Sequence, residues 1–407
     1  MKLSQFRFKL PEEQIALYPH TSKRIVTRSD GTTRTFEVTR RDESRLMVLH
    51  RKSQKIEMFN KEVSGTPKES DFIRFKDILN YFEEGDTFVF NDTKVFPARL
   101  YGTKEKTDAK IEVFLLRELN EQQRLWDVLV EPARKIRIGN KLFFDESGAM
   151  VAEVIDNTTS RGRTLRFLYD CPHDEFKREL FALGQAPLPH YIIDHTTTKQ
   201  VEDPAHPGQT KTKQVNDRPY REEDLEDFQT VYAKHEGAVT APATGLHFSR
   251  EMMKKMEIIG INSAFVTLHC GLGTFHNIEV EDLTKHKMDS EQMNIDAEAC
   301  NIVNVAKREG HHVCAIGASV VKATETAVGT DGLLKEYEGW TNKFIFPPYE
   351  FGLADSMVAN FYHPLSTLLM ATAAFGGYDL VMEAYNKAVE YGYKFGCYGD
   401  SLLILND

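Results

Sequence analysis

The chain has 407 residues, of which 41% are hydrophobic, 28% charged and 11% aromatic. This length predicts two or three domains whose core folds without disulfides or a metal, and the composition excludes a largely disordered or fibrous protein. No apolar run approaches the roughly 20 residues that span a bilayer, and the first residues lack the apolar segment of a secretory signal. We therefore expect a cytoplasmic protein.

Cysteine and charge patterns narrow the class further. The five cysteines are scattered and none forms a Cys-x-x-Cys pair, which predicts free thiols and no metal site. The net charge of −10 argues against a surface that is basic throughout, but residues 23–55 carry a net charge of +6 and residues 94–141 one of +4. Such local excess predicts either a face that binds a phosphate backbone or ordinary solvated loops.

The first half of the chain contains short, mainly β-like segments. Residues 11–17 read as a short helix with proline near its start. The polar stretch 21–41 reads as an insertion or a hairpin with a turn signal at Ser29-Asp30-Gly31. From Asp86 to about Asp170 the pattern has period two between Gly, Asp and Asn turns, which predicts a small β-barrel. Its strand-like runs are Thr87–Phe90, Lys110–Leu116, Trp126–Val130 and Arg163–Leu168.

The second half alternates strands and helices. A polar insert at 194–220 has too few large apolar residues to form a core and is expected to be a mobile loop. Beyond it, Ser249 is a suitable helix N-cap and Gly310 a helix stop. This alternation predicts an α/β domain with a substantially parallel sheet. Helices are expected at Arg250–Glu257, Asp296–Glu309, Ser366–Phe375 and Tyr378–Tyr391, and strands at Ala264–Leu268, Val313–Gly317 and Leu402–Leu405.

These patterns together predict an α/β domain with an inserted all-β domain, a small barrel. The α/β domain is expected to be discontinuous and to comprise residues 1–85 and 180–407. The inserted barrel is expected at 86–179, and the polar insert loops at 21–41 and 194–220.

Small and polar residues follow several of the expected strands, which is where ligands bind in α/β sheets. The segment 237–248 places His247 just before a helix, where a lone histidine is more often structural than catalytic. The segment 267–275 places His269 before Gly271-Leu272-Gly273. A Gly-x-Gly after a strand suits an adenosine or phosphate-bearing ligand, but it also fits a plain tight turn.

The segment 317–325 opens a helix directly after a strand. Its amide groups and the Ser319 hydroxyl are candidates to hold a carboxylate or phosphate. Lys322 and Glu325 share one helical face, and a surface ion pair between them is the alternative to ligand binding. Two further polar groups are Asn360 with His363 in the loop 358–367, and Asp289 with Glu291 in the cluster 286–291.

The sequences of these segments and their order along the chain resemble those of the S-adenosylmethionine:tRNA ribosyltransferase-isomerase (QueA) family of queuosine biosynthesis. The likeness covers nearly the whole chain except the two polar inserts. It is carried by Phe6–Pro11, Gly85–Asp86, Val89–Leu100, Phe228–Ala233, Gly245–Phe248, Phe265–His269 and Tyr398–Asp400.

The resemblance implies an α/β domain with an inserted β-barrel, and a reaction between S-adenosylmethionine and tRNA. The ribosyl part of S-adenosylmethionine is transferred to 7-aminomethyl-7-deazaguanine in the anticodon and isomerised. Adenine and methionine leave, epoxyqueuosine remains, and no metal is needed. The sulfonium acidifies the neighbouring 5′ carbon, so a base is needed there, whereas the departing adenine benefits from an acid.

Under this resemblance the candidate site residues fall into three groups. The expected catalytic residues are His247, His269 and His363. The expected substrate-binding residues are Thr244, Gly271, Gly273, Ser319, Lys322, Glu325, Asn360, Asp289 and Glu291. The expected tRNA-binding residues are Arg134, Lys135 and Arg137, which lie in or beside a turn of the barrel.

Several of the site segments differ from the family's sequence motifs, whereas the segments expected to form the scaffold stay close to them. The family's Thr-Ala order is exchanged at Thr244, and Ala318 and Lys322 replace a threonine and an arginine. The histidine of the Asn-Phe-His pattern is shifted by one position to His363, behind Tyr362. Lysine does not replace a forked guanidinium conservatively. The departures leave two alternatives open, a divergent paralogue with another acceptor or a catalytically silent protein that binds tRNA or a nucleoside.

Overall fold

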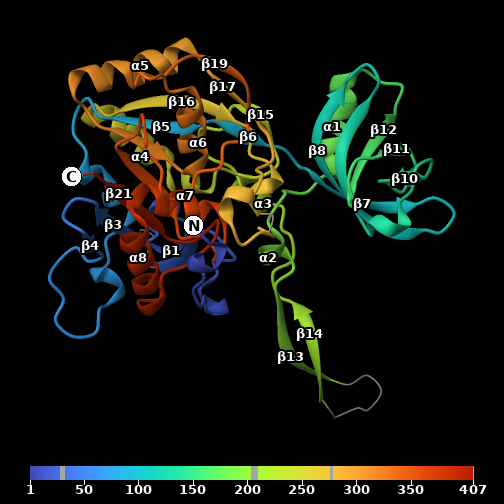
Figure 1. Ribbon diagram of the computed structural model, residues 1–407. Helices are drawn as coiled ribbons and strands as arrows, with labels where there is room; N and C mark the ends of the chain where they lie inside the picture. Colours follow the sequence, from blue (N-terminus) through green and yellow to red (C-terminus); the bar gives the residue numbers. More distant parts are fainter. Residues whose placement is uncertain (28–32, 203–209, 276–277, 407) are drawn as a thin grey trace. The chain divides into compact units, whose positions relative to one another are not determined.

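The computed structural model describes all residues except 28–32, 203–209, 276–277 and 407 (Figure 1). The chain forms two compact units. The first unit comprises Met1–Lys94, Gln229–His235 and Ala241–Asp407, and the second comprises Val95–Phe228 and Glu236–Thr240.

The first unit is built on a mixed nine-stranded sheet. β5 is central and runs parallel to β16 on one side and to β18 on the other, with β20 parallel to β18. The carboxyl ends of these four strands therefore lie at one edge of the sheet. In spatial order the strands are β19 (Tyr337–Thr341), β17 (Glu291–Ile295), β16 (Asn262–Leu268), β5 (Thr87–Asn91), β18 (Val313–Ile316), β20 (Ser356–Asn360), β21 (Ser401–Leu405), β3 (Leu46–His50) and β4 (Lys55–Glu57).

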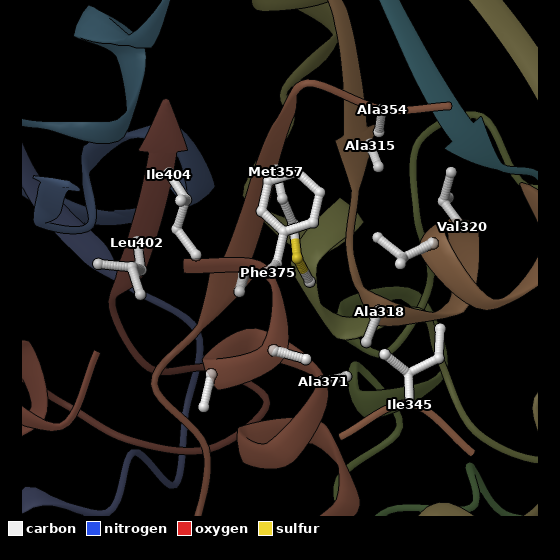
Figure 2. Close-up of a cluster of buried hydrophobic side chains, with 14 of the residues drawn as sticks. Ala315, Ala318, Val320, Ile345, Ala354, Met357, Ala371, Phe375, Leu402 and Ile404 are labelled. Carbon is white, nitrogen blue, oxygen red and sulfur yellow. The ribbon is translucent and has the colours of Figure 1, made fainter. Parts of the chain in front are cut away.

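Helices and loops cover both faces of this sheet. Because successive side chains of a strand point to opposite faces, Val89 joins one core cluster and its neighbour Phe88 joins the other. Burial on both faces explains why the central strands are almost continuously apolar. Figure 2 shows part of the first cluster, which includes Met357 of β20 and Phe375 of α7, both fully buried. The helices are α4 (Arg250–Ile259), α5 (Ala297–Glu309), α6 (Ala318–Ala327), α7 (Thr367–Gly376) and α8 (Tyr378–Glu390).

Local signals in the sequence set the ends of these helices. The side chains of Ser249, Asp296 and Ser366 each accept a hydrogen bond from the backbone N–H three residues later, which caps α4, α5 and α7. Gly310 ends α5 with φ of 82°, a left-handed conformation that favours glycine. The predicted helices and strands of the second half are confirmed to within about two residues.

The second unit contains a closed antiparallel barrel of six strands, which confirms the predicted all-β module. Helix α1 (His173–Leu183) packs on it through Phe176, whose ring centroid lies 5.2 Å from that of Phe167. The barrel strands are β7 (Arg99–Lys104), β8 (Ala109–Asn120), β9 (Leu125–Glu131), β10 (Lys141–Phe143), β11 (Val151–Asn157) and β12 (Gly162–Leu168).

Short elements complete the two units. The remaining strands are β1 (Thr21–Thr27), β2 (Thr33–Thr39), β6 (Thr93–Val95), β13 (Thr196–Glu202), β14 (Thr210–Asn216) and β15 (His235–Ala238), and the remaining α-helices are α2 (His190–Ile193) and α3 (Asp224–Asp227). The 3₁₀ helices are η1 (Leu3–Phe6), η2 (Glu12–Gln14), η3 (Arg41–Glu43), η4 (Glu69–Asp71), η5 (Phe75–Tyr81), η6 (Ala133–Lys135), η7 (Ala243–His247), η8 (Leu272–Phe275) and η9 (Leu283–Lys285).

Four sequence-based expectations differ from the structure. The sequence predicts the run Thr87–Phe90 as a barrel strand, but it forms β5 of the nine-stranded sheet, so the barrel unit begins at Val95 and not at residue 86. That unit also extends beyond residue 179 to Phe228. The insert 194–220, expected as a loop, forms the antiparallel pair β13–β14. Residues 11–17 contain only the 3₁₀ turn η2.

The hairpin predicted for the first polar insert, residues 21–41, is confirmed. β1 and β2 pair antiparallel from Thr21 opposite Thr39 to Thr27 opposite Thr33. The predicted turn signal at Ser29-Asp30-Gly31 lies outside the described residues. Within the described part of the chain, no helix combines the length and apolarity needed to cross a membrane.

Candidate active site

The first turn of α6 is where several of the predicted site segments meet. It follows Gly317, whose φ is 93° and where a Cβ would stand 3.2 Å from Thr244 Oγ1. Ser319 in the same turn accepts a hydrogen bond from Asn91 Nδ2 at 3.3 Å and also interacts with the thiol of Cys270. The loops that carry these residues therefore converge at the carboxyl ends of β5, β16 and β18.

His247 at the end of η7 is held by protein groups on both ring nitrogens. Asn360 donates its Nδ2 hydrogens to the carbonyls of Gly396 and Cys397, so its Oδ1 faces His247 Nε2 at 3.2 Å. This network assigns the ring hydrogen to Nε2. Nδ1 lies 2.8 Å from Ser44 Oγ. Burial lowers the pKa of His247 to about 4, so the ring is neutral near pH 7. These contacts favour the structural interpretation of His247.

His269 is differently placed, directly after β16 and only half-buried. Its Nδ1 lies 2.8 Å from Thr93 Oγ1, and its backbone N–H donates to the carbonyl of Gln292 at 2.9 Å. Burial, with a smaller contribution from the nearby His235, lowers the pKa of His269. For its other ring nitrogen, Nε2, the described residues provide no hydrogen-bond partner.

Lys322 and Glu291 form a buried ion pair beside the Gly271 turn. Lys322 Nζ lies 2.6 Å from Glu291 Oε2, and the two side chains are only 10% and 6% exposed. The other carboxylate oxygen, Oε1, accepts the N–H of Gly271 at 2.8 Å. Gly273, two residues further on, lies against Asp289, where a Cβ would come within 2.6 Å of Oδ2. Glu291 and Asp289 thus shape the turn that follows His269.

Glu325 does not pair with Lys322, although the spacing of the two residues along the helix would allow such an ion pair. Its carboxylate instead accepts the backbone N–H groups of Gly352, at 3.0 Å, and Leu353, at 3.2 Å. The Tyr349 hydroxyl also donates to it at 3.3 Å, and burial followed by this carboxylate raises the pKa of Tyr349 to about 12. The contacts of Glu325 therefore anchor a loop, and they do not support the expected substrate-binding role.

The segment after β20 contributes Tyr362 and His363. Tyr362 is buried and its hydroxyl lies 3.1 Å from Thr244 Oγ1, which ties this segment to η7. Burial lowers the pKa of His363, and its backbone carbonyl accepts the hydroxyl of Ser366, the cap of α7. Asn360 and Tyr362 connect this segment to two other predicted site residues, His247 and Thr244.

Three consecutive residues between the end of β5 and the start of β6 were not singled out from the sequence. Asn91 binds both the N–H of Leu268, at 3.0 Å, and its carbonyl, at 2.9 Å. Asp92 accepts the hydroxyl of Thr267 at 2.6 Å, and burial raises the pKa of Asp92. Thr93 contacts His269. The available signal was a buried strand that stops at Asn-Asp, a polar strand end of the kind that forms sites in α/β sheets.

The predicted tRNA-binding residues lie in the second unit, around η6. Arg134, Lys135 and Arg137 are all exposed, and the described residues place no carboxylate within ion-pair distance of them. The buried Arg163 supports this turn by donating to the carbonyls of Ala133, at 2.7 Å, and Ile136, at 3.1 Å. Three exposed cations are therefore held on an ordered turn.

The described residues contain no group of three or more His, Cys, Asp or Glu side chains placed to hold a metal ion. The five cysteines are all free thiols, four of them buried.

Comparison with known proteins identifies the family. A family model described as "Queuosine biosynthesis protein" matches residues 3–404. The chain is 61% identical to a curated protein of Phocaeicola vulgatus and 58% identical to one of Parabacteroides distasonis, in each case over 100% of both chains. The chain belongs to the queuosine biosynthesis protein family. This membership confirms the resemblance drawn from its motifs.

The curated relatives of this family carry a specific name. Both relatives are named S-adenosylmethionine:tRNA ribosyltransferase-isomerase. A solved structure, that of an S-adenosylmethionine tRNA ribosyltransferase from Thermotoga maritima, is similar to 98% of this chain and 100% of its own, with 29% identity and a TM-score of 0.48.

Proposed function

We propose that this chain is an S-adenosylmethionine:tRNA ribosyltransferase-isomerase. It transfers the ribosyl part of S-adenosylmethionine to 7-aminomethyl-7-deazaguanine in tRNA and isomerises it, giving epoxyqueuosine-tRNA, adenine and methionine. The observation that carries this proposal is the 61% identity over full length to a curated protein of that name. Nothing in the described site favours the silent or altered-acceptor alternatives, because the substituted residues Thr244, Lys322 and Tyr362 have ordered partners.

Lys322 illustrates why the substitutions in the family's sequence motifs do not argue for lost activity. Its ammonium has a buried carboxylate partner, Glu291, at 2.6 Å. A decayed site would leave such a charge without compensation, which is strongly unfavourable. We infer that Lys322 and Glu291 act as a unit that shapes the Gly271 turn.

The donor substrate is proposed to bind around the first turn of α6. Thr244, Ser319 and the Gly271-x-Gly273 turn surround this point, and small residues there allow a ligand to approach the backbone closely. The reaction needs a base at the 5′ carbon and a donor for departing adenine. His269 is the proposed catalytic histidine, whereas His247 positions Asn360 at the end of β20.

The acceptor tRNA is proposed to contact the basic turn at η6. Its three exposed cations have no carboxylate partner among the described residues, which suits a phosphate backbone. We propose no metal cofactor, since the proposed chemistry is proton transfer and displacement at carbon.

The decisive experiment is a direct assay. Purified protein is mixed with S-adenosylmethionine and tRNA that carries 7-aminomethyl-7-deazaguanine, and mass spectrometry follows epoxyqueuosine in the tRNA together with released adenine. We expect both products in equal amounts. An active family member tests the reagents, and His269→Ala tests that the activity belongs to this site.

Two other outcomes would overturn the proposal in distinct ways. Adenine release without modification of this tRNA would indicate another acceptor. Salt-dependent tRNA binding without consumption of S-adenosylmethionine, from folded protein, would indicate a silent binding protein.

A further inference from the structure

The side chain of Asn91, at the end of β5, fixes the distance between Thr93 and His269 by accepting hydrogen bonds from two backbone N–H groups. A single acceptor, Asn91 Oδ1, receives the N–H of Thr93 at 3.2 Å and the N–H of Leu268 at 3.0 Å. The residue after Leu268 is His269, whose Nδ1 then lies 2.8 Å from Thr93 Oγ1. Thr93 is fully buried. The contact between hydroxyl and imidazole is therefore a built feature of two adjacent strand ends.

We propose that Thr93 is a positioning residue that holds neutral His269 in the tautomer with its hydrogen on Nε2. His269 then meets its ligand as a hydrogen-bond donor. The identity of that ligand rests on the proposed function, but the tautomer itself does not.

Proton counting at Thr93 supports this assignment. A threonine hydroxyl has one hydrogen to donate, and among the described residues His269 Nδ1 is the one hydrogen-bond partner of this hydroxyl. If Nδ1 carried the ring hydrogen, Nδ1 would donate to Oγ1 and the Thr93 O–H would be left buried without an acceptor. An unsatisfied buried donor is unfavourable. The arrangement that satisfies both groups has the Thr93 O–H donating to a bare Nδ1.

The consequence lies at the other ring nitrogen. With Nδ1 occupied as an acceptor, Nε2 carries the hydrogen, and no described residue accepts it. A neutral imidazole in this state cannot take up the proton of the 5′ carbon at Nε2. It can donate a hydrogen bond to a ring nitrogen of adenine, which keeps the electron pair when its bond to the ribosyl carbon breaks. Within the proposed reaction, His269 therefore serves the leaving group, and another group is the base.

Ring-nitrogen NMR on the free protein tests the tautomer directly, because protonated and bare imidazole nitrogens have well-separated shifts. The protein is labelled with ¹⁵N-histidine, and the His269 signals are identified by their loss in His269→Gln. We expect a protonated Nε2 and a bare Nδ1 in the wild type and in Thr93→Ser. In Thr93→Val, which removes the hydroxyl at nearly constant shape, we expect a mixture of tautomers.

A second fully buried threonine provides a matched control. Thr87 lies at the start of β5, and its hydroxyl has no hydrogen-bond partner in the described structure. Thr87→Val should leave the His269 shifts unchanged. A protonated Nδ1 in the wild type, or an unchanged tautomer in Thr93→Val, would overturn the proposal whether or not the protein modifies tRNA.

A second measurement tests the donor role during turnover. The amide nitrogen of glutamine can stand near the place of Nε2 and donate a hydrogen bond, but it cannot accept a proton there. We expect His269→Gln to retain turnover at least roughly tenfold above His269→Ala, as for a lost hydrogen-bond donor in an active site. Equal loss in both variants, with wild-type activity intact, would show that His269 acts as the base and would overturn the donor role.

Discussion

Asp400, in the loop before β21, is a buried carboxyl whose ionisation is costly. It accepts the N–H of Arg45 at 2.7 Å and that of Lys394 at 2.8 Å, which favours the charged form. Burial outweighs these bonds and raises the pKa of Asp400 to about 6. The unfolded chain ionises this group near its ordinary pKa, so its contribution to stability is complete below about pH 4 and is lost as the pH rises through 6.

The predicted effect is measured with Asp400→Asn. The substitution lowers the unfolding free energy by an amount that does not depend on pH, because one hydrogen-bond acceptor is lost. It also removes the titration of the carboxyl group. Between pH 4 and pH 7, the unfolding free energy of the variant relative to the wild type should rise by roughly 2.4 kcal/mol. Urea unfolding at several pH values gives this difference. A difference that stays constant with pH would contradict the raised pKa.

The contribution of His247 to stability should change with pH in the direction opposite to that of Asp400. Its pKa is lowered to about 4 by burial, so the unfolded chain binds a proton below about pH 6.5 that the folded chain refuses. His247 also stacks on Phe75, with ring centroids 4.8 Å apart. We expect His247→Ala to lower the unfolding free energy by about 3 kcal/mol at pH 7, and this deficit to shrink by about 2 to 3 kcal/mol at pH 4.5.

The measurement again is urea unfolding, now with turnover recorded beside it. Because both ring nitrogens bind protein groups, the loss of activity should follow the loss of folded protein. A folded, fully stable His247→Ala without turnover would restore the catalytic interpretation that the sequence motif suggested.

Between elements, the Lys322–Glu291 ion pair joins α6 to the start of β17. Removing one partner leaves a buried charge without compensation, which costs about 3 to 5 kcal/mol. We expect Lys322→Met and Glu291→Gln each to destabilise strongly, and the double variant to be more stable than the sum of the two effects predicts, by at least about 1 kcal/mol. Glutamine keeps an oxygen for the Gly271 N–H, so the cycle isolates the ion pair.

An exposed pair on the same unit gives the control for this cycle. Lys335 Nζ lies 2.7 Å from Asp331 Oδ2, with both side chains about half exposed at 53% and 51%. The coupling of this pair should stay below about 1 kcal/mol because solvent screens it. Similar coupling energies in the two cycles would show that burial of the Lys322–Glu291 pair has no energetic consequence.

The elements that the sequence predicted well are those whose signals are local. The cap Ser249 and the stop at Gly310 lie beside the helices they delimit, and both were identified correctly. The prediction of Thr87–Phe90 as a barrel strand was wrong because it depended on the β-like segments that follow in the chain. The strands that pair with β5, which are β16 and β18, lie far away in sequence. The hairpin at 194–220 was missed because its strands are polar.

The same distinction explains the site. Sequence motifs located the loops at the strand ends, and Thr244, Ser319 and His269 do converge. They did not reveal that Lys322 pairs with Glu291, 31 residues away, in place of its helical neighbour Glu325. Nor did they reveal the contact of Thr93 with His269 across 176 residues. Partner choice over such separations depends on which strands are adjacent, and periodicity within a segment carries no information on that.

For the molecule as a whole, the question is how a chain of net charge −10 binds a polyanion. The proposed answer is local, since the η6 turn presents Arg134, Lys135 and Arg137 without carboxylate partners in the described structure. Each cation that contacts a phosphate adds about 0.7 to 0.9 to the slope of log affinity against log salt. Replacing all three with alanine should therefore weaken tRNA binding and reduce the steepness of this slope by about 2 to 3.

A matched variant separates a local effect from the change in total charge. Arg250, Lys254 and Lys255 are three exposed cations on α4 of the first unit, and their replacement with alanine changes the net charge by the same amount. If the η6 turn binds tRNA, this second triple variant should keep the wild-type slope, and turnover measured at saturating tRNA should stay unchanged in both. Equal loss of slope in the two variants would instead show that only the overall charge matters, and the η6 turn would then not be the tRNA-binding surface.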